Sequence, residues 1–142
     1  MILLDTNVVS EPLKVTSDAN VLAWIDAQMV ETLYLSTISL AELRFGVAAL
    51  PEGRRRDSLH ASLEQRILPL FAGRIVPFDE PASHSYATLR ARARATGQAI
   101  APVDGYIAAI AATHGFAVAT RDTSPFKAAG LTVINPWTWK AQ

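Results

Sequence analysis

The order of hydrophobic and polar residues predicts strands and helices in alternation along the chain. Short continuous apolar runs indicate strands buried on both faces, as in a parallel sheet. Apolar residues at spacings of three and four indicate amphipathic helices between those strands. We expect strands at residues 2–4, 32–36, 75–78, 116–120 and 131–134, and helices at residues 20–30, 39–50, 54–70, 81–96 and 102–115.

Single residues mark several of these expected boundaries. Ser39 is a suitable helix cap, which would place Glu42 in the first helical turn. Pro102 suits the first position of a helix and puts Asp104 at about the third position, while Gly97 suits the end of the preceding helix. Because strands joined by helices need crossover connections, the pattern predicts an α/β fold with a parallel sheet of about five strands covered on both faces.

Composition narrows the possible functions. The 142 residues are 50% hydrophobic and 18% charged, which predicts one compact domain over residues 1–142. Thirteen basic residues balance thirteen acidic ones, so strong and indiscriminate attraction to nucleic acid is not indicated. The absence of cysteine excludes disulfides, thiolate zinc sites and cysteine nucleophiles.

The sequence carries no sign of export or of membrane insertion. Its first residues are not a basic segment ahead of a long apolar one, so we expect a cytoplasmic protein. The most apolar window, residues 99–119, contains Pro102, Asp104 and His114. A charged residue is costly in lipid, so this window is interpreted as a buried helix followed by a buried strand.

We expect four carboxylates at the same edge of the predicted sheet. Asp5 and Asp122 follow two predicted strands, while Glu42 and Asp104 lie near the starts of two predicted helices. Ligands of open parallel sheets bind at the carboxyl ends of the strands. Clustered carboxylates need cations, and without cysteine or suitably spaced histidines the oxygen ligands select Mg²⁺, or Mn²⁺, over zinc.

Each carboxylate also has an ordinary explanation when it is considered alone. Asp5 is typical of a turn or helix cap, and Glu42 of a favourable interaction with a helix dipole. Asp104 is typical of a helix terminus, and Asp122 of a cap or of a partner for an arginine. Only the convergence of all four at one edge favours a metal site.

Two groups of arginines are more typical of solvated helix faces than of a binding site. Contact with phosphate is the alternative interpretation for both groups. They comprise residues 54–56 and the alternating Arg90, Arg92 and Arg94.

Four segments in order resemble the motifs of the PIN-domain family. The resemblance spans nearly the whole chain and is carried by residues 1–8 (MILLDTNV), 39–46 (SLAELRFG), 104–109 (DGYIAA) and 118–122 (VATRD). Within that family the chain is most similar to VapC-type toxins of the FitB-like branch. Residues 9–13 (VSEPL) and 68–75 (LPLFAGRI) carry this closer resemblance.

The resemblance implies a PIN-like three-layer α/β/α sandwich and an Mg²⁺-dependent endoribonuclease. Its acidic pocket would comprise Asp5, Glu42, Asp104 and Asp122, with Asp5 and Asp104 as the direct metal ligands. Asn7 and Thr120 match polar positions that orient the acids or the substrate. The family pattern has small residues where this chain has Pro102, but a proline at the first helical position is compatible with the site.

The resemblance also implies partners. These are a cognate VapB-like antitoxin with a DNA-binding domain, operator DNA reached only through the antitoxin complex, and a homodimer or higher hetero-oligomer. The alternative is a catalytically weak module that acts with its antitoxin in operator binding and autoregulation. A phosphotransferase with Asp5 as nucleophile is disfavoured, because Asn7 stands where such a motif needs a second aspartate.

Overall fold

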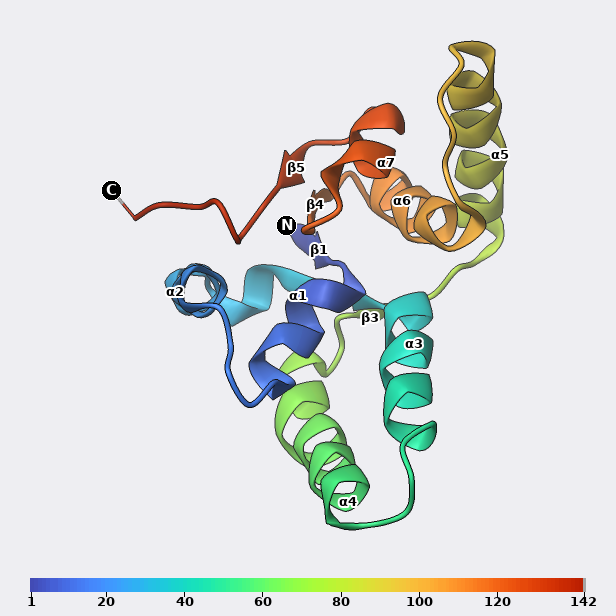
Figure 1. Cartoon of the computed structure of the whole chain (residues 1–142). Helices are drawn as coiled ribbons and strands as arrows, with labels where there is room; N and C mark the ends of the chain where they lie inside the picture. The colour runs from blue at the N-terminus through green and yellow to red at the C-terminus, as the bar shows by residue number, and fades with distance from the viewer. Residues whose placement is uncertain (142) are drawn as a thin grey trace.

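A five-stranded parallel sheet forms the centre of the computed structural model, which describes residues 1–141 (Figure 1). The strand order is β3-β2-β1-β4-β5, so the first strand of the chain lies in the middle of the sheet. Every neighbouring pair is parallel. The strands are β1 (Ile2–Leu4), β2 (Leu33–Ser36), β3 (Ile75–Val76), β4 (Ala117–Ala119) and β5 (Val133–Ile134).

Seven α-helices connect and cover these strands in the described part of the chain. They are α1 (Thr6–Ser10), α2 (Ala19–Ala27), α3 (Thr37–Ala48), α4 (Arg54–Ala61), α5 (Glu80–Ala95), α6 (Pro102–His114) and α7 (Thr123–Ala128). Shorter turns are the 3₁₀ segments η1 (Glu11–Leu13), η2 (Val30–Thr32) and η4 (Leu68–Phe71) and the π-helical η3 (Ser62–Ile67). Within residues 1–141, none of the helices has both the length and the apolar character needed to cross a membrane.

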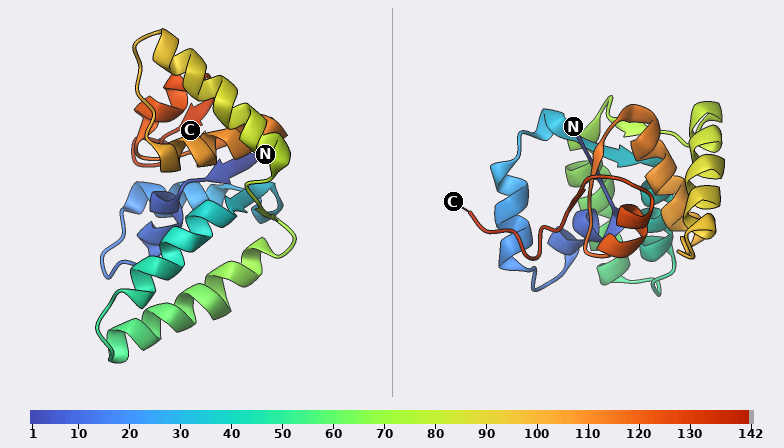
Figure 2. Two further views of the ribbon diagram at one scale, coloured as in Figure 1. Left: turned by 90° about the vertical axis from the view of Figure 1, so that its right-hand side faces the viewer. Right: turned by 90° about the horizontal axis from the view of Figure 1, so that it is seen from above.

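The sheet separates two hydrophobic cores because successive side chains of a strand point to opposite faces. Leu3 and Val118 face the layer of α5, α6 and α7, and Leu4 and Ala119 face the layer that contains α2 and α3. Figure 2 shows α5 and α6 on one side of the strands, and α3 and α4 on the other. The expected three-layer α/β/α sandwich is therefore confirmed.

The start of α3 differs from the sequence-based expectation. Ser36, the last residue of β2, caps the helix by accepting a hydrogen bond from the Ser39 N–H at 3.0 Å. The expected cap at Ser39 is wrong, because Ser39 is the third residue of the helix. Glu42 consequently lies in the second turn and not in the first. The helix starts directly at the strand end because Ser36 combines extended backbone with a hydroxyl acceptor.

Short helices at strand ends were not predicted. Helix α1 has five residues and α7 has six, too few for an apolar period to be visible. The segment expected to be one helix over residues 54–70 is divided into α4, η3 and η4. Pro69 lies in η4 and lacks a backbone N–H, which limits continuation of a regular helix.

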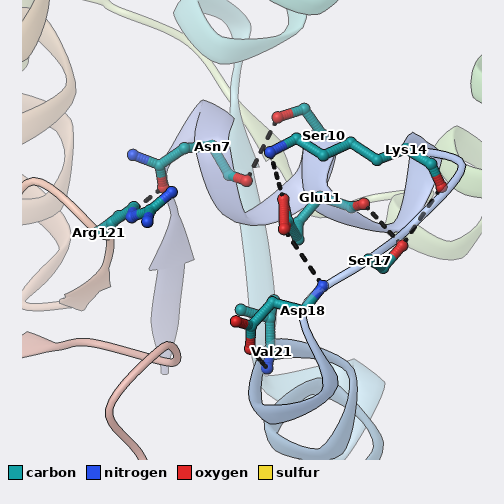
Figure 3. A network of polar contacts seen from close by, with 8 residues as sticks. All are labelled: Asn7, Ser10, Glu11, Lys14, Ser17, Asp18, Val21 and Arg121. Atoms are coloured by element: carbon teal, nitrogen blue, oxygen red, sulfur yellow. Dashed lines mark hydrogen bonds and ion pairs between the residues drawn. The ribbon is translucent and has the colours of Figure 1, made fainter.

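A buried glutamate joins the segment after α1 to the start of α2 (Figure 3). Glu11 is 4% exposed, and its Oε1 accepts a hydrogen bond from the Asp18 N–H at 3.3 Å. Its Oε2 lies 2.8 Å from Lys14 Nζ, and its carbonyl accepts from the Ser17 hydroxyl at 3.0 Å. These contacts hold the turn between the two helices and so restrain the chain that follows α1.

Replacing two helical glycines by alanine should change the stability of the protein in opposite directions. A Cβ on Gly105 would lie 2.9 Å from Tyr86 Cε2 and 3.3 Å from Arg90 Cδ. Gly105→Ala should therefore lower the free energy of unfolding by about 1–3 kcal/mol. A Cβ on Gly46 meets nothing within 4 Å, so Gly46→Ala should raise it by about 0.5–1 kcal/mol. Urea denaturation measures both values, and equal effects of the two substitutions would contradict the packing of α5 against α6.

Candidate active site

Asp5 is placed by the pairing of the two central strands. Leu4 lies opposite Ala119 in the parallel register, and the Asp5 N–H donates to the Ala119 carbonyl at 2.9 Å. The strand ends there because Asp5 caps α1, its Oδ1 accepting from the Thr6 N–H at 2.8 Å. Asp5 is 6% exposed. Its carboxylate is thus held at the carboxyl edge of the sheet with little access to solvent.

Thr120, the residue after β4, fixes the second oxygen of Asp5. Its side chain is fully buried, and its hydroxyl donates to Asp5 Oδ2 at 2.8 Å. The same hydroxyl oxygen accepts hydrogen bonds from the Asp122 N–H at 3.1 Å and from Asn7 Nδ2 at 3.4 Å. One donated bond and two accepted bonds use the full capacity of a hydroxyl group. Thr120 therefore couples the carboxylate of Asp5 to the backbone that leads to Asp122.

Asn7 joins α1 to the segment after β4. Its Nδ2 donates to the Thr120 hydroxyl, and its Oδ1 accepts from the Arg121 N–H at 3.3 Å. Figure 3 shows Asn7 and Arg121 facing each other from these two segments. Asn7 thereby holds the start of α1 against the loop that carries Asp122.

Glu42 reaches the same edge from α3. Its Oε1 accepts a hydrogen bond of 2.6 Å from the Thr6 hydroxyl. The buried Ser39 hydroxyl lies 3.0 Å from Thr6 Oγ1 and can donate to it, since the single Thr6 hydroxyl hydrogen is directed at Glu42. Thr6 and this contact of Ser39 were not predicted from the sequence, because both depend on how α1 packs on α3.

Asp104 completes the arrangement from α6. It is the third residue of the helix, as expected, and Pro102 occupies the first position. Its carboxyl group is half-buried. Burial raises the pKa of Asp104, and the nearby carboxylates of Asp122 and Glu42 raise it further. Asp122 itself is exposed at the surface of the site.

The electrostatics of Asp5 show that the acids influence one another. Burial raises the pKa of Asp5 to about 6, an effect reduced by the hydrogen bonds from Thr120 and Thr6. The charges of Asp104 and Glu42 contribute to the same upward shift. Like charges that raise each other's pKa mark a place where a cation would be stabilised.

In the described part of the chain, none of the four acids forms an ion pair with a side-chain cation. The ion pairs there join Lys14 to Glu11 and Arg44 to Glu64. Lys14 and Arg55 line a cavity together with Thr6 and Glu42, but neither forms an ion pair with Glu42. Among residues 1–141, no three histidine, aspartate or glutamate side chains are grouped as a ready-made ligand set for a metal. Mg²⁺ commonly binds through only one or two carboxylates and keeps several water ligands. The carboxylate oxygens of this site therefore fit Mg²⁺ even though three such side chains are not grouped among the described residues.

The fold and the site define a class of α/β domain in which segments distant in sequence bring carboxylates to one edge of a parallel sheet. The chain belongs to the PIN-domain family, whose model, described as "PIN domain", matches residues 2–131.

Relatives of known name and structure cover nearly the whole chain. The VapC ribonuclease Y4jK of Sinorhizobium fredii is 63% identical over 137 residues, which are 96% of this chain and 98% of that protein. Toxin FitB of Neisseria gonorrhoeae is 56% identical over 137 residues, 96% of this chain and 99% of the toxin. A chain in the structure of FitAB bound to an IR36 DNA fragment has a TM-score of 0.96 and 53% identity, with 99% of each chain covered.

Neutralising Asp104 should stabilise the metal-free protein. The pKa of Asp104 is raised in the folded protein, so ionising this group lowers the free energy of unfolding. This loss is absent below pH 3.8, the ordinary pKa, and it develops as the pH rises through the pKa of the folded protein. In EDTA at pH 7, Asp104→Asn should raise Tm, and this difference should shrink toward pH 4. Differential scanning fluorimetry across pH checks both statements.

Added Mg²⁺ provides a second readout of the same variant. It should raise Tm of the unmutated protein by mass action and leave Asp104→Asn unchanged. Asp26→Asn, which removes an exposed carboxylate on α2, is the matched control and should retain the Mg²⁺ response. An equal response in Asp104→Asn would show that Asp104 does not hold the ion.

The Thr120 hydroxyl is expected to contribute to stability. Thr120→Val keeps the shape of the side chain but leaves Asp5 Oδ2 and the Asp122 N–H without this partner. The free energy of unfolding should fall by about 1–3 kcal/mol. Thr120→Ser retains the hydroxyl and should lose less. Urea denaturation at pH 7 compares the two variants, and a valine variant as stable as the serine variant would contradict this role.

Proposed function

We propose that this protein is the toxin of a type II toxin-antitoxin pair and that it hydrolyses RNA phosphodiester bonds as an Mg²⁺-dependent endoribonuclease, with Mn²⁺ as a substitute ion. The observation that carries the proposal is the buried Asp5 beside Asp104 and Glu42, with no side-chain cation paired to them within residues 1–141. The names of the relatives, a VapC ribonuclease and a FitB toxin, support the same activity.

The four acids divide into direct ligands and supporting groups in this proposal. Asp5 and Asp104 are the proposed direct ligands, because they match the metal-binding positions of the PIN-domain motifs. The charges of neighbouring acids, which raise the pKa of both, support a cation at this edge. Glu42 and Asp122 complete the charge of the site, directly or through bound water. A divalent ion bound by these acids would supply an activated water for attack and would stabilise charge on the phosphoryl and leaving oxygens.

The hydroxyl and amide groups keep the acids in place. Thr120 and the Thr6 N–H restrain both oxygens of Asp5. The Thr6 hydroxyl restrains Glu42, so the first residue of α1 holds two acids from different elements. Asn7 holds the loop before Asp122. A site held in this way needs little reorganisation when the substrate binds.

The neutral total charge is compatible with an RNA substrate. Setting the four site acids aside leaves thirteen basic residues against nine acidic ones. The rest of the chain is therefore mildly basic, while the acidic centre would be neutralised by the ion. Such a distribution favours local binding of RNA over strong binding to every polyanion.

The proposed partner is a VapB-like antitoxin that blocks the acidic site and carries the DNA-binding domain. The related structure of FitAB bound to an IR36 DNA fragment supports an assembly that reaches operator DNA through the antitoxin. The assembly would contain a homodimer of the toxin or a higher hetero-oligomer.

Incubation of the purified protein with total RNA tests the reaction. Mg²⁺ should support cleavage, and EDTA should abolish it. Asp104→Asn should reduce the rate by at least about 10²-fold, while Asp26→Asn should leave it unchanged. Mapping the new RNA ends gives the cleavage sites and the rates.

The control for contaminating nuclease is the Asp104→Asn protein purified in the same way. Cleavage at the same rate by that variant would refute the assignment. Operator binding with the antitoxin but no Mg²⁺-dependent cleavage would favour the catalytically weak, autoregulatory module instead.

A further inference from the structure

A basic cavity lies at the C-terminal end of α5. It has a volume of about 580 Å³ and is lined by Arg90, Ala91, Arg94, Gln98, Ala99 and Ile100. No acidic residue is among the described residues that line it. Arg90 and Arg94 are four residues apart in the helix, so their side chains lie on the same face.

Arg90 is held in position and still has free hydrogen-bond donors. Its Nη1 donates to the Tyr86 hydroxyl at 2.7 Å, and its guanidinium lies 5.4 Å from the centre of the Tyr86 ring. Within residues 1–141 no acceptor is found for its other N–H groups, and neither Arg90 nor Arg94 forms an ion pair. A guanidinium with five donors and a fixed orientation suits an oxyanion such as phosphate.

One residue that lines the cavity, Arg90, also contacts the first turns of α6, the helix that carries Asp104. Figure 1 shows α5 beside α6. Gly105 follows Asp104 directly, and because it has no side chain, Tyr86 Cε2 and Arg90 Cδ come within 2.9 Å and 3.3 Å of its Cβ position. The Tyr86 ring also stacks on Tyr106 at 4.8 Å between centroids. Arg90 therefore links the basic cavity to the start of the helix that carries Asp104.

We propose that Arg90 and Arg94 bind a backbone phosphate of the single RNA strand that the acidic site cleaves. This inference rests on the proposed function and deepens it, because it says where the RNA strand is bound beyond the acidic site. Four clustered carboxylates repel a polyanion, and two arginines on the helix that packs against α6 would offset this repulsion farther along the strand. The arginines contact phosphate, so they position RNA without selecting its sequence.

Arg92 provides a matched comparison on the same helix. It lies between Arg90 and Arg94 in the sequence but borders a different cavity, with His84, Ser85, Thr88, Leu89, Ala112 and Ala129. Arg92 and Arg94 are both exposed and both belong to the last turn of α5. They differ in the side of the helix from which they project, so a specific phosphate site predicts unequal effects of substituting them.

Binding of single-stranded RNA under non-cleaving conditions tests the proposal. The probe is a fluorescein-labelled RNA of mixed sequence and about twelve nucleotides, with Asp104→Asn as the common background. Anisotropy is measured over a series of KCl concentrations. Arg94→Glu should weaken Kd about tenfold or more, whereas Arg92→Glu should change it less than about threefold.

The salt dependence separates a phosphate contact from a loss of folding. Arg94→Ala should reduce the slope of log Kd against log salt by about 0.7, the value for one phosphate contact on a single strand. Arg90→Lys keeps the charge but not the guanidinium, and should weaken binding with an unchanged circular dichroism spectrum. Equal losses for the Arg92 and Arg94 variants, or no RNA binding by the background protein, would overturn the proposal.

Two further outcomes keep this inference distinct from the proposed nuclease. If the unmutated protein does not cleave RNA but Arg94→Glu still loses RNA binding selectively, the phosphate site stands and the nuclease assignment falls. If cleavage and RNA binding survive in Arg94→Glu while binding of the antitoxin is lost, the cavity is a protein-binding site and the phosphate proposal is wrong.

Discussion

The pairing of β1 with β4 is the constraint on which the site depends. It places Leu4 opposite Ala119, and its continuation brings the buried carboxylate of Asp5 next to the hydroxyl of Thr120. A buried carboxylate loses hydration, and the raised pKa of Asp5 is the consequence. The structure keeps this group at the sheet edge because hydrogen bonds satisfy both oxygens and the surrounding layers hold the strand ends together.

The same edge combines elements with different roles. Helix α1 begins directly at Asp5, and its first residue, Thr6, reaches Glu42 on α3. Helix α6 brings Asp104 from the opposite layer, packed through Gly105 against Tyr86 of α5. The acidic centre is therefore built between the two hydrophobic cores, and neither core alone positions all of its groups. This arrangement links the packing of α5 on α6 to the electrostatics of the proposed site.

Some features of the site were visible in the sequence because they follow from local patterns. The apolar run before Asp5 ends abruptly, and Pro102 marks the start of the helix that carries Asp104. The position of Glu42 was less accurate, since Ser36 and not Ser39 caps α3. Thr6 carried no distinguishing signal, because a hydroxyl after a strand is common and its contact with Glu42 joins residues far apart in the chain.

The sequence by itself determined the alternation of strands and helices, the parallel sheet and the candidate acids, because apolar periodicity and abrupt polar ends are local properties. Only the tertiary structure decided which side of each helix faces the site. Positions 90, 92 and 94 all hold arginine and look alike in the sequence. In the structure Arg90 and Arg94 line one cavity, whereas Arg92 lines another. The physical reason is that the contact of α5 with α6 sets the orientation of the helix, and that contact depends on packing between distant segments.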